Sequence, residues 1–126
     1  GGYTHVRSNG LCLMLHTELH NFHDAMGVCE AEGAKLALYD NEQELSDILS
    51  LFNNTGALVW IGITDLVKEG EWKFWNGKTP TILRWAENEP NGGVNEDCGA
   101  MYSSSTSIMD YPCATELWFI CQRYLP

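Results

Sequence analysis

The sequence is poor in basic residues and has no long apolar run. Only 7 of its 126 residues are Lys or Arg, against 17 Asp and Glu, which gives a formal net charge of -10 at pH 7. A nucleic acid or an anionic membrane needs a basic face on its protein partner, so this balance argues against both. No stretch reaches the roughly 18 consecutive apolar residues of a membrane-spanning helix, and no signal peptide is recognisable. The acidity fits either ordinary solubility or oxygen ligands for a hard cation such as calcium.

Motifs of common metal and catalytic sites are also missing. None of the five cysteines stands in a Cys-x-x-Cys pair, so disulfides suit them better than zinc, and disulfides imply an oxidising, extracellular compartment. There is no EF-hand pattern, Gly-x-Ser-x-Gly motif or Cys/His nucleophile arrangement. A glycosidase pair formed by Glu89 and Glu96 is the weaker alternative. We therefore expect a secreted binding protein rather than an enzyme.

The elements expected from the pattern give one α+β domain over residues 1–126, because neither a repeat nor a linker interrupts the chain. A strand over Leu11–Thr17 precedes a helix that Asn21 caps and Gly33 ends. A second helix opens at Asn41, with Glu44 placed as in a capping box. The later expected strands are Leu58–Ile63, Gly70–Gly77, Cys98–Tyr102 and Trp118–Gln122, with a loop rich in Pro, Asn and Gly over 78–97 and a turn over 103–107.

Carboxylates and amides concentrate where these strands end. They are Asp65 and Glu69 after the apolar run, Glu89, Asn91, Asn95, Glu96 and Asp97 before Cys98, and Asp110 three residues before Cys113. Calcium takes about six to eight oxygen ligands in flexible geometry. A calcium site assembled from separate segments is therefore predicted.

Taken together in this order, these segments resemble the C-type lectin domain, and the stretch 63–70 resembles its collectin type. The matching marks are the helix ending in Cys29, Trp60-Ile61-Gly62, Glu89-Pro90-Asn91, Asn95-Glu96-Asp97-Cys98, and Cys113 with Phe119-Ile120-Cys121. The resemblance implies a disulfide-stapled α+β fold with two helices, small antiparallel sheets and a long loop. It also implies calcium-dependent binding of mannose-, glucose- or fucose-type glycans, as in pattern recognition by innate immunity.

The resemblance further assigns individual residues. It implies a principal calcium and sugar site at Glu89, Asn91, Glu96 and Asp110, with a cis Glu89–Pro90 bond. In such a site a sugar hydroxyl shares a lone pair with calcium, donates to a carboxylate and accepts from an amide. It also implies a second calcium site at Asp65, Glu69, Asp97 and the Glu96 carbonyl, and the disulfides Cys29–Cys121 and Cys98–Cys113. The five cysteines alone leave their pairing open.

Two positions depart from the family pattern. Met109 stands where the family has an Asn that binds calcium and sugar, and Gly92 stands where collectin-like domains often have an Asp. A thioether is a poor ligand for a hard cation and cannot donate a hydrogen bond. A weaker site or an altered sugar preference is predicted. The alternative is a protein-interaction module of the same fold, either calcium-independent or ordered by calcium.

Cys12 and Asn53 carry two further expectations. Cys12 is left over from the implied disulfides, so it is a buried thiol, pairs with a cysteine outside this sequence, or links to a second chain in a homo- or heterodimer. A dimer would raise the avidity of a weak sugar site. Asn53 begins the sequon Asn-Asn-Thr, which is compatible with glycosylation and secretion.

Histidines and tryptophans have simpler expected roles. His16, His20 and His23 are spaced at i, i+4 and i+7, which could suggest zinc, but polar surface residues are the favoured interpretation. The five tryptophans are expected in the core. Trp85, beside the polar loop, is the expected exception that could stack on a sugar.

Overall fold

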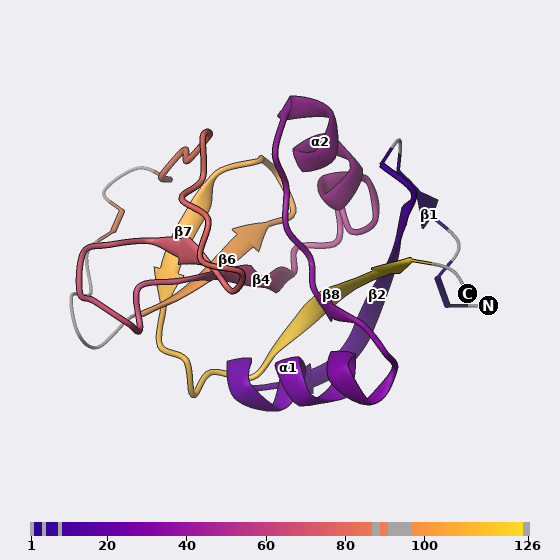
Figure 1. Ribbon diagram of the computed structural model, residues 1–126, viewed down its shortest axis with the longest axis horizontal. Helices are drawn as coiled ribbons and strands as arrows, with labels where there is room; N and C mark the ends of the chain where they lie inside the picture. Colours follow the sequence, from indigo (N-terminus) through magenta and orange to yellow (C-terminus); the bar gives the residue numbers. More distant parts are fainter. Residues whose placement is uncertain (1, 4, 8, 87–88, 91–96, 125–126) are drawn as a thin grey trace.

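The computed structural model describes residues 2–3, 5–7, 9–86, 89–90 and 97–124. These residues form a sheet with one helix on each side (Figure 1). The helices are α1 (Phe22–Ala31) and α2 (Glu42–Ser50). The strands are β1 (His5–Val6), β2 (Leu11–His20), β3 (Lys35–Leu36), β4 (Leu58–Thr64), β5 (Lys73–Phe74), β6 (Cys98–Tyr102), β7 (Ile108–Tyr111) and β8 (Leu117–Tyr124). The α+β class is confirmed.

The sheet is mixed, because one parallel pairing joins its two halves. Its strand order is β1-β2-β8-β4-β6-β7, with β3 also paired to β8 and β5 to β4. Strands β4 and β8 run parallel, with Val59 opposite Trp118 and Trp60 opposite Phe119. Every other pairing between the described strands is antiparallel. The small antiparallel sheets that were expected are thus connected into a single hydrogen-bonded sheet.

Both helices begin at the asparagines that the sequence indicates. The Asn21 side chain accepts a hydrogen bond from the Asp24 amide, and Asn41 accepts one from the Glu44 amide, each at 2.8 Å. Such caps satisfy amides that have no partner inside the helix. The Glu44 carboxylate in turn accepts from the Asp40 amide at 2.7 Å, one residue earlier than in a standard capping box.

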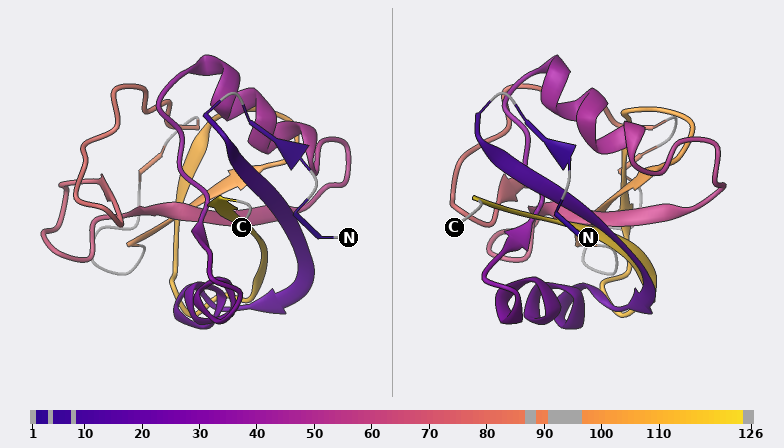
Figure 2. Two further views of the ribbon diagram at one scale, coloured as in Figure 1. Left: turned by 45° about the vertical axis from the view of Figure 1, so that its right-hand side comes forward. Right: turned by 90° about the vertical axis from the view of Figure 1, so that its right-hand side faces the viewer.

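Two apolar clusters fill the space between the sheet and the two helices. Side chains alternate along a strand, so Val59, Ile61 and Ile63 of β4 join the cluster that includes Leu45 and Ile48 of α2. Trp60 points the other way, into the cluster of α1. Figure 2 shows the two helices on opposite sides of the sheet from two further directions.

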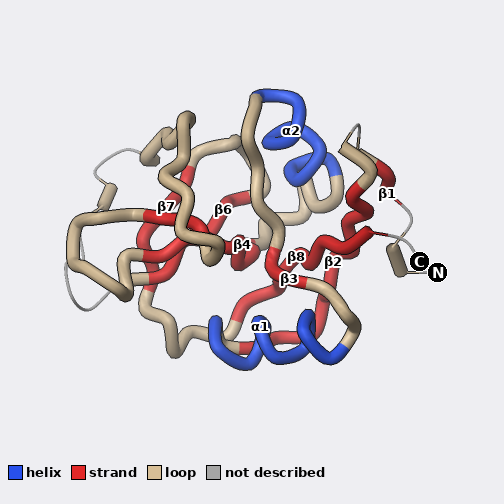
Figure 3. Tube along the Cα trace, viewed as in Figure 1, coloured by secondary structure: helices blue, strands red, loops and turns tan. Residues whose placement is uncertain are grey.

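Several strands differ from those expected. Strand β2 continues to His20, and β5 is only Lys73–Phe74 because the Phe74 amide donates to the Lys78 carbonyl at 2.9 Å and turns the chain. The short strands β1, β3 and β7 were not expected. Figure 3 shows that the described residues between β5 and β6 are mostly loop, as predicted; residues 87–88 and 91–96 of the expected loop lie outside the described residues.

The structure contains both disulfides that the resemblance implies. Cys29–Cys121 joins α1 to β8, and Cys98–Cys113 joins β6 to the segment after β7. Cys12 forms no disulfide and is 0% exposed. This burial agrees with the buried-thiol alternative. A partner cysteine outside this sequence and a link to a second chain stay predictions.

The loop over 65–72 and the chain ends lie at opposite ends of the protein. This loop extends to the far left of Figure 1, whereas the N and C labels lie together at the right. Pairing of Leu11 with Tyr124 brings the two ends together. Neither described helix is long and apolar enough to cross a membrane.

Candidate metal centre

Three carboxylates gather beyond the end of β4. Ligand oxygens of Asp65, Glu69 and Asp97 all lie within 4.8 Å of one another. Within the described ranges, the one other such group is His16, Glu32 and Cys121, but the Cys121 sulfur is committed to a disulfide. The acid cluster, defined as Asp65, Glu69 and Asp97, is therefore the candidate metal centre.

The backbone holds the acid cluster in place. The Asp65 amide donates to the Asp97 carbonyl at 3.1 Å, which ties the end of β4 to the start of β6. The Gly70 amide donates to Asp65 Oδ2 at 2.8 Å and closes the loop that carries Glu69. Gly70 has a φ of 84°, a left-handed conformation that glycine adopts without strain.

The two lysines nearest in sequence to Glu69 and Asp65 pair with another carboxylate, and part of the acid cluster is buried without hydrogen-bond partners in the described part of the chain. Asp65 is only 2% exposed, and one buried oxygen of Asp65 and one of Asp97 (Oδ1 in each) have no hydrogen-bond partner there. The nearby Lys68 and Lys73 form ion pairs with Glu71, at 3.4 and 3.5 Å. Buried carboxylate oxygens without a partner are costly, so the cluster is suited to a cation.

Proximity of the three carboxylates changes their pKa values. The pKa of Glu69 is raised to about 7, first by loss of hydration and then by hydrogen bonds and repulsion from Asp97 and Asp65. The pKa of Asp65 is also raised, mainly by burial, although the hydrogen bond from Gly70 opposes this. Repulsion of this kind disappears when a cation binds between the carboxylates.

The chemistry of these ligands fits calcium better than zinc. The cluster offers only oxygen, from carboxylates on two separate segments, and hard cations such as calcium prefer oxygen ligands. Structural zinc sites use Cys and His in tetrahedral geometry. Asp65, Glu69 and Asp97 are therefore the residues that would hold calcium here.

The structure describes only half of the ligand set implied for the principal site. Asn91 and Glu96 lie outside the described residues. Asp110 is 1% exposed on β7, and Glu89 is half-buried before a cis bond to Pro90. The segment leading to Glu89 runs beside β7, because the Ala86 amide donates to Ile108 and the Ile108 amide donates to Arg84, at 2.9 and 2.7 Å. The full ligand set remains a prediction.

Met109 lies beside Asp110 on β7. Met109 is opposite Ala100 of β6 and half-buried, whereas Asp110 is opposite Gly99 and buried. A thioether is a poor ligand for a hard cation and has no hydrogen to donate. The Met109 thioether therefore supplies neither a hard-cation ligand nor a hydrogen-bond donor next to Asp110.

The three histidines do not form a zinc site. The ring of His16 lies 2.9 Å from Glu18 and 3.0 Å from Glu32, and it stacks on Phe119 with centroids 4.5 Å apart. Among the described residues, His16 does not share a ligand group with His20 or His23. His16 is 3% exposed, so it is a buried, hydrogen-bonded residue rather than the surface residue that was expected.

Tryptophan exposure also differs from the expectation. Trp85 is half-buried and packs edge-on against Trp72, with centroids 4.9 Å apart. Trp75 is instead 41% exposed. The only feature of the sequence that could have indicated the exposure of Trp75 is its position in the turn between Phe74 and Gly77.

Comparison with known proteins agrees with the fold. The family model described as "Lectin C-type domain" matches residues 18–123. A chicken (Gallus gallus) hepatic lectin is 30% identical over 120 residues, which cover 93% of this chain and 56% of the lectin. The cow CD23 C-type carbohydrate-recognition domain, solved in the presence of a GlcNAc2Man3 oligosaccharide, is 25% identical with a TM-score of 0.84, covering 93% of this chain and 90% of that one.

A calcium-independent type II antifreeze protein has the same fold. Its TM-score is 0.86 at 22% identity, covering 98% of this chain and 92% of that one. The chain belongs to the C-type lectin domain family, and the family resemblance is confirmed. It spans only about half the length of the hepatic lectin. The fold alone therefore decides neither the calcium dependence nor the ligand.

Proposed function

We propose that this domain binds calcium and, together with the ion, mannose-, glucose- or fucose-type glycans, without catalysis. The observation that carries the proposal is the acid cluster, in which buried oxygens of Asp65 and Asp97 have no described hydrogen-bond partner. A calcium ion bound between these two carboxylate oxygens would be coordinated by both. The loop that contributes Asp97 also contains Glu89, Asn91 and Glu96 of the proposed sugar site.

Recognition of the sugar would fall to the side chains around a second ion, the calcium of the principal site. Bound calcium supplies coordination positions for two neighbouring sugar hydroxyls. The carboxylates of Glu89 and Glu96 accept the hydroxyl hydrogens, the Asn91 amide donates to a hydroxyl oxygen, and Asp110 completes the ligand set. Because two neighbouring hydroxyls must fit these fixed positions, the site would select sugars by the stereochemistry of the ring.

The relatives support a glycan as partner. The chicken relative is named a lectin, and the cow CD23 domain was solved with a mannose-containing oligosaccharide. We propose a secreted role in recognising microbial or cell-surface glycans, as part of innate immunity. The exposed Asn53 of the sequon suits a glycoprotein.

A second candidate function is protein binding. Beside the acid cluster, Val67 is 100% and Leu66 is 45% exposed, and Met109 replaces a sugar-binding Asn. Exposed apolar side chains at the tip of a loop are common at protein contacts. Calcium would then only order the loop, or would not bind.

Calorimetric titration with calcium, followed by mannose, fucose and galactose with and without chelator, tests the proposal. We expect calcium binding and a chelator-sensitive response to mannose or fucose. Asp65→Asn should weaken calcium binding, whereas Glu116→Gln, an exposed carboxylate outside the loop, should not. Calcium binding without any sugar response would favour protein binding. Absence of calcium binding would refute the calcium site.

A further inference from the structure

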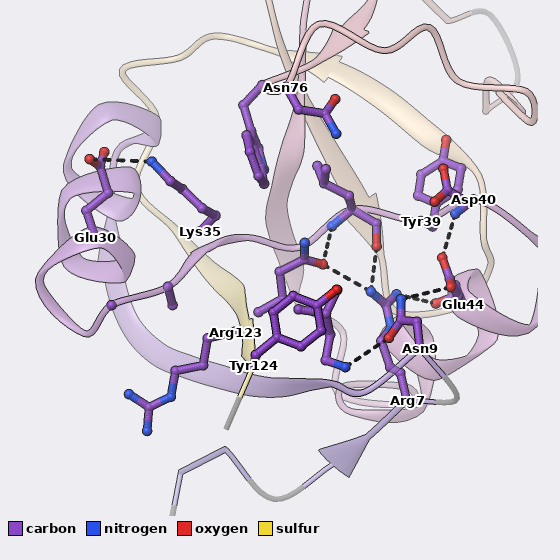
Figure 4. A pocket seen from close by; sticks show the side chains of 16 residues that line it. Arg7, Asn9, Glu30, Lys35, Tyr39, Asp40, Glu44, Asn76, Arg123 and Tyr124 are labelled. Carbon is purple, nitrogen blue, oxygen red and sulfur yellow. Dashed lines mark hydrogen bonds and ion pairs between the residues drawn. The ribbon is translucent and has the colours of Figure 1, made fainter. Parts of the chain in front are cut away.

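A groove with no role in the calcium site lies at another part of the protein. It encloses about 640 Å³ and lies beside β3 and the end of β8, between α1 and α2 (Figure 4). A smaller hollow of about 130 Å³ adjoins it and shares Glu30, Lys35 and Trp75. Ligand sites commonly have volumes of about 300–1,000 Å³. No residue of the acid cluster lines either hollow.

Two exposed aromatic side chains line this groove. Trp75 is 41% and Tyr124 is 68% exposed. The Trp75 indole is fixed, because its ring nitrogen donates to the Leu36 carbonyl at 2.8 Å. It also lies so close to Gly62 that an added Cβ there would be 2.4 Å from the indole. Trp75 is thus a rigid aromatic surface that loses little conformational entropy when a ligand contacts it.

The floor of the groove is preformed and polar. Gln122 Oε1 accepts hydrogen bonds from the Leu38 amide at 2.9 Å and from Arg7 at 3.1 Å. Arg7 also donates to the carbonyls of Leu38 and Glu44, at 2.7 and 2.8 Å. Figure 4 shows this network in the centre of the groove. Because these groups already have partners, the floor is not a deep apolar pocket for a hydrophobic side chain of another protein.

The charges that line the groove are balanced. The cations are Arg7, Lys35 and Arg123, and the anions are Glu30, Asp40 and Glu44. Several of these groups neutralise one another or nearby residues; for example, Lys35 lies 3.7 Å from Glu30. This local balance contrasts with the net charge of -10 of the chain. An uncharged ligand therefore suits the groove better than an ion.

We propose that this groove is a second, calcium-independent binding site for a neutral oligosaccharide. A sugar ring has an apolar C–H face that can lie on Trp75 or Tyr124, and hydroxyls at its edge that can bond to polar groups. The exposed side chains of Asn76, Asp40 and Glu30 offer an amide and two carboxylates at the rim. The adjoining hollow gives room for more than one sugar ring, so a chain of sugars binds better than a monosaccharide.

Nuclear magnetic resonance titration of the whole chain in excess EDTA tests this site without the calcium site. The probes are maltotriose, mannotriose and chitotriose. We expect at least one to shift the Trp75 indole signal and the amides of Lys35 and Asn76, with a Kd near 1 mM. Tyr124→Ala should weaken the binding about 3- to 10-fold, the usual range for loss of one aromatic contact.

Tyr102→Ala is the matched control, because Tyr102 is a 41% exposed tyrosine on β6 that does not line the groove. It should leave the titration unchanged. The proposal is overturned if none of the three trisaccharides shifts these signals, or if Tyr124→Ala and Tyr102→Ala have equal effects. Preference for a trisaccharide of charged sugars, or for an aromatic peptide, would likewise overturn it. Since calcium is removed throughout, failure here is distinguishable from failure of the calcium-dependent function.

Discussion

Met109 is the residue at which the chain departs from the principal-site calcium ligands of the family pattern. It stands beside the buried Asp110 on β7, where a thioether adds neither a hard ligand nor a donor. Met109→Asn should strengthen calcium binding by about tenfold, since one added polar interaction contributes ~1.4 kcal/mol. Calorimetry would measure it. Met109→Leu is the control and should not change the affinity. If Met109→Asn left the calcium affinity unchanged, the hypothesis that Met109 weakens the calcium site would be wrong.

Glu69 makes the site sensitive to pH. Its folded pKa of about 7 lies above its ordinary value of 4.5, so below pH 7 the calcium-free fold takes up a proton that calcium must displace. Calcium affinity should fall about twentyfold from pH 7.5 to 5.5 for one competing proton. Without calcium, the free energy of unfolding depends on pH in the opposite direction. Between pH 7 and 4.5 the folded state binds more protons than the unfolded state, so the stability of the calcium-free fold rises as the pH falls through this range.

Calorimetry at the two pH values would measure the first effect, and thermal unfolding in EDTA the second. Glu69→Gln should reduce both pH dependences. An affinity that stayed constant across this range would show that Glu69 is not a ligand.

At the scale of elements, the packing of β6 against β4 requires a glycine at position 99, where there is no room for a side chain. A Cβ at Gly99 would lie 2.2 Å from the buried Ile63 side chain and 3.0 Å from its carbonyl oxygen. Gly99→Ala should therefore lower the free energy of unfolding by about 1–3 kcal/mol. Gly27→Ala is the matched control, because it lies within α1 with nothing within 4 Å, and should raise stability by about 0.5–1 kcal/mol. Urea denaturation would measure both. Equal effects of the two substitutions would contradict this packing.

The elements also show why part of the fold was predictable. Both helices follow from local signals, a capping Asn and an apolar stripe, and these were observed at Asn21 and Asn41. Strands β3 and β7 are short. Strand β3 pairs with β8, far away in the sequence, for example Lys35 with Gln122, whereas β7 pairs with the preceding strand β6. Nothing in their own residues indicates such pairing. The exposure of Trp75 likewise depends on Gly62, on another strand.

The candidate site was predictable to a different extent. Asp65, Glu69 and Asp97 were found because the family resemblance places them, and the structure brings them together. Position along the chain could not reveal that the nearby Lys68 and Lys73 pair with Glu71 and leave the acid cluster without a described cation. The groove was missed entirely, because its residues are scattered over distant segments.

At the scale of the whole molecule, the two disulfides constrain loops of very different length. Cys98 and Cys113 are 15 residues apart, and Cys29 and Cys121 are 92 apart. Because longer loops lose more entropy on closure, replacing the first pair by Ala should cost about 3 kcal/mol and the second about 4–5 kcal/mol. Chemical denaturation would measure these losses. Removing the first pair should also weaken calcium binding, and a full retention of affinity would show that this disulfide does not order the loop.

Cys12 is a natural probe for local opening of the sheet. It is the one cysteine outside the disulfides, and its side chain is 0% exposed between β1 and β8. A thiol reagent can modify it only after these strands separate. The rate of modification therefore measures how often the sheet opens locally. A ligand that slows this rate without touching Cys12 would reveal how far its binding energy spreads through the strands.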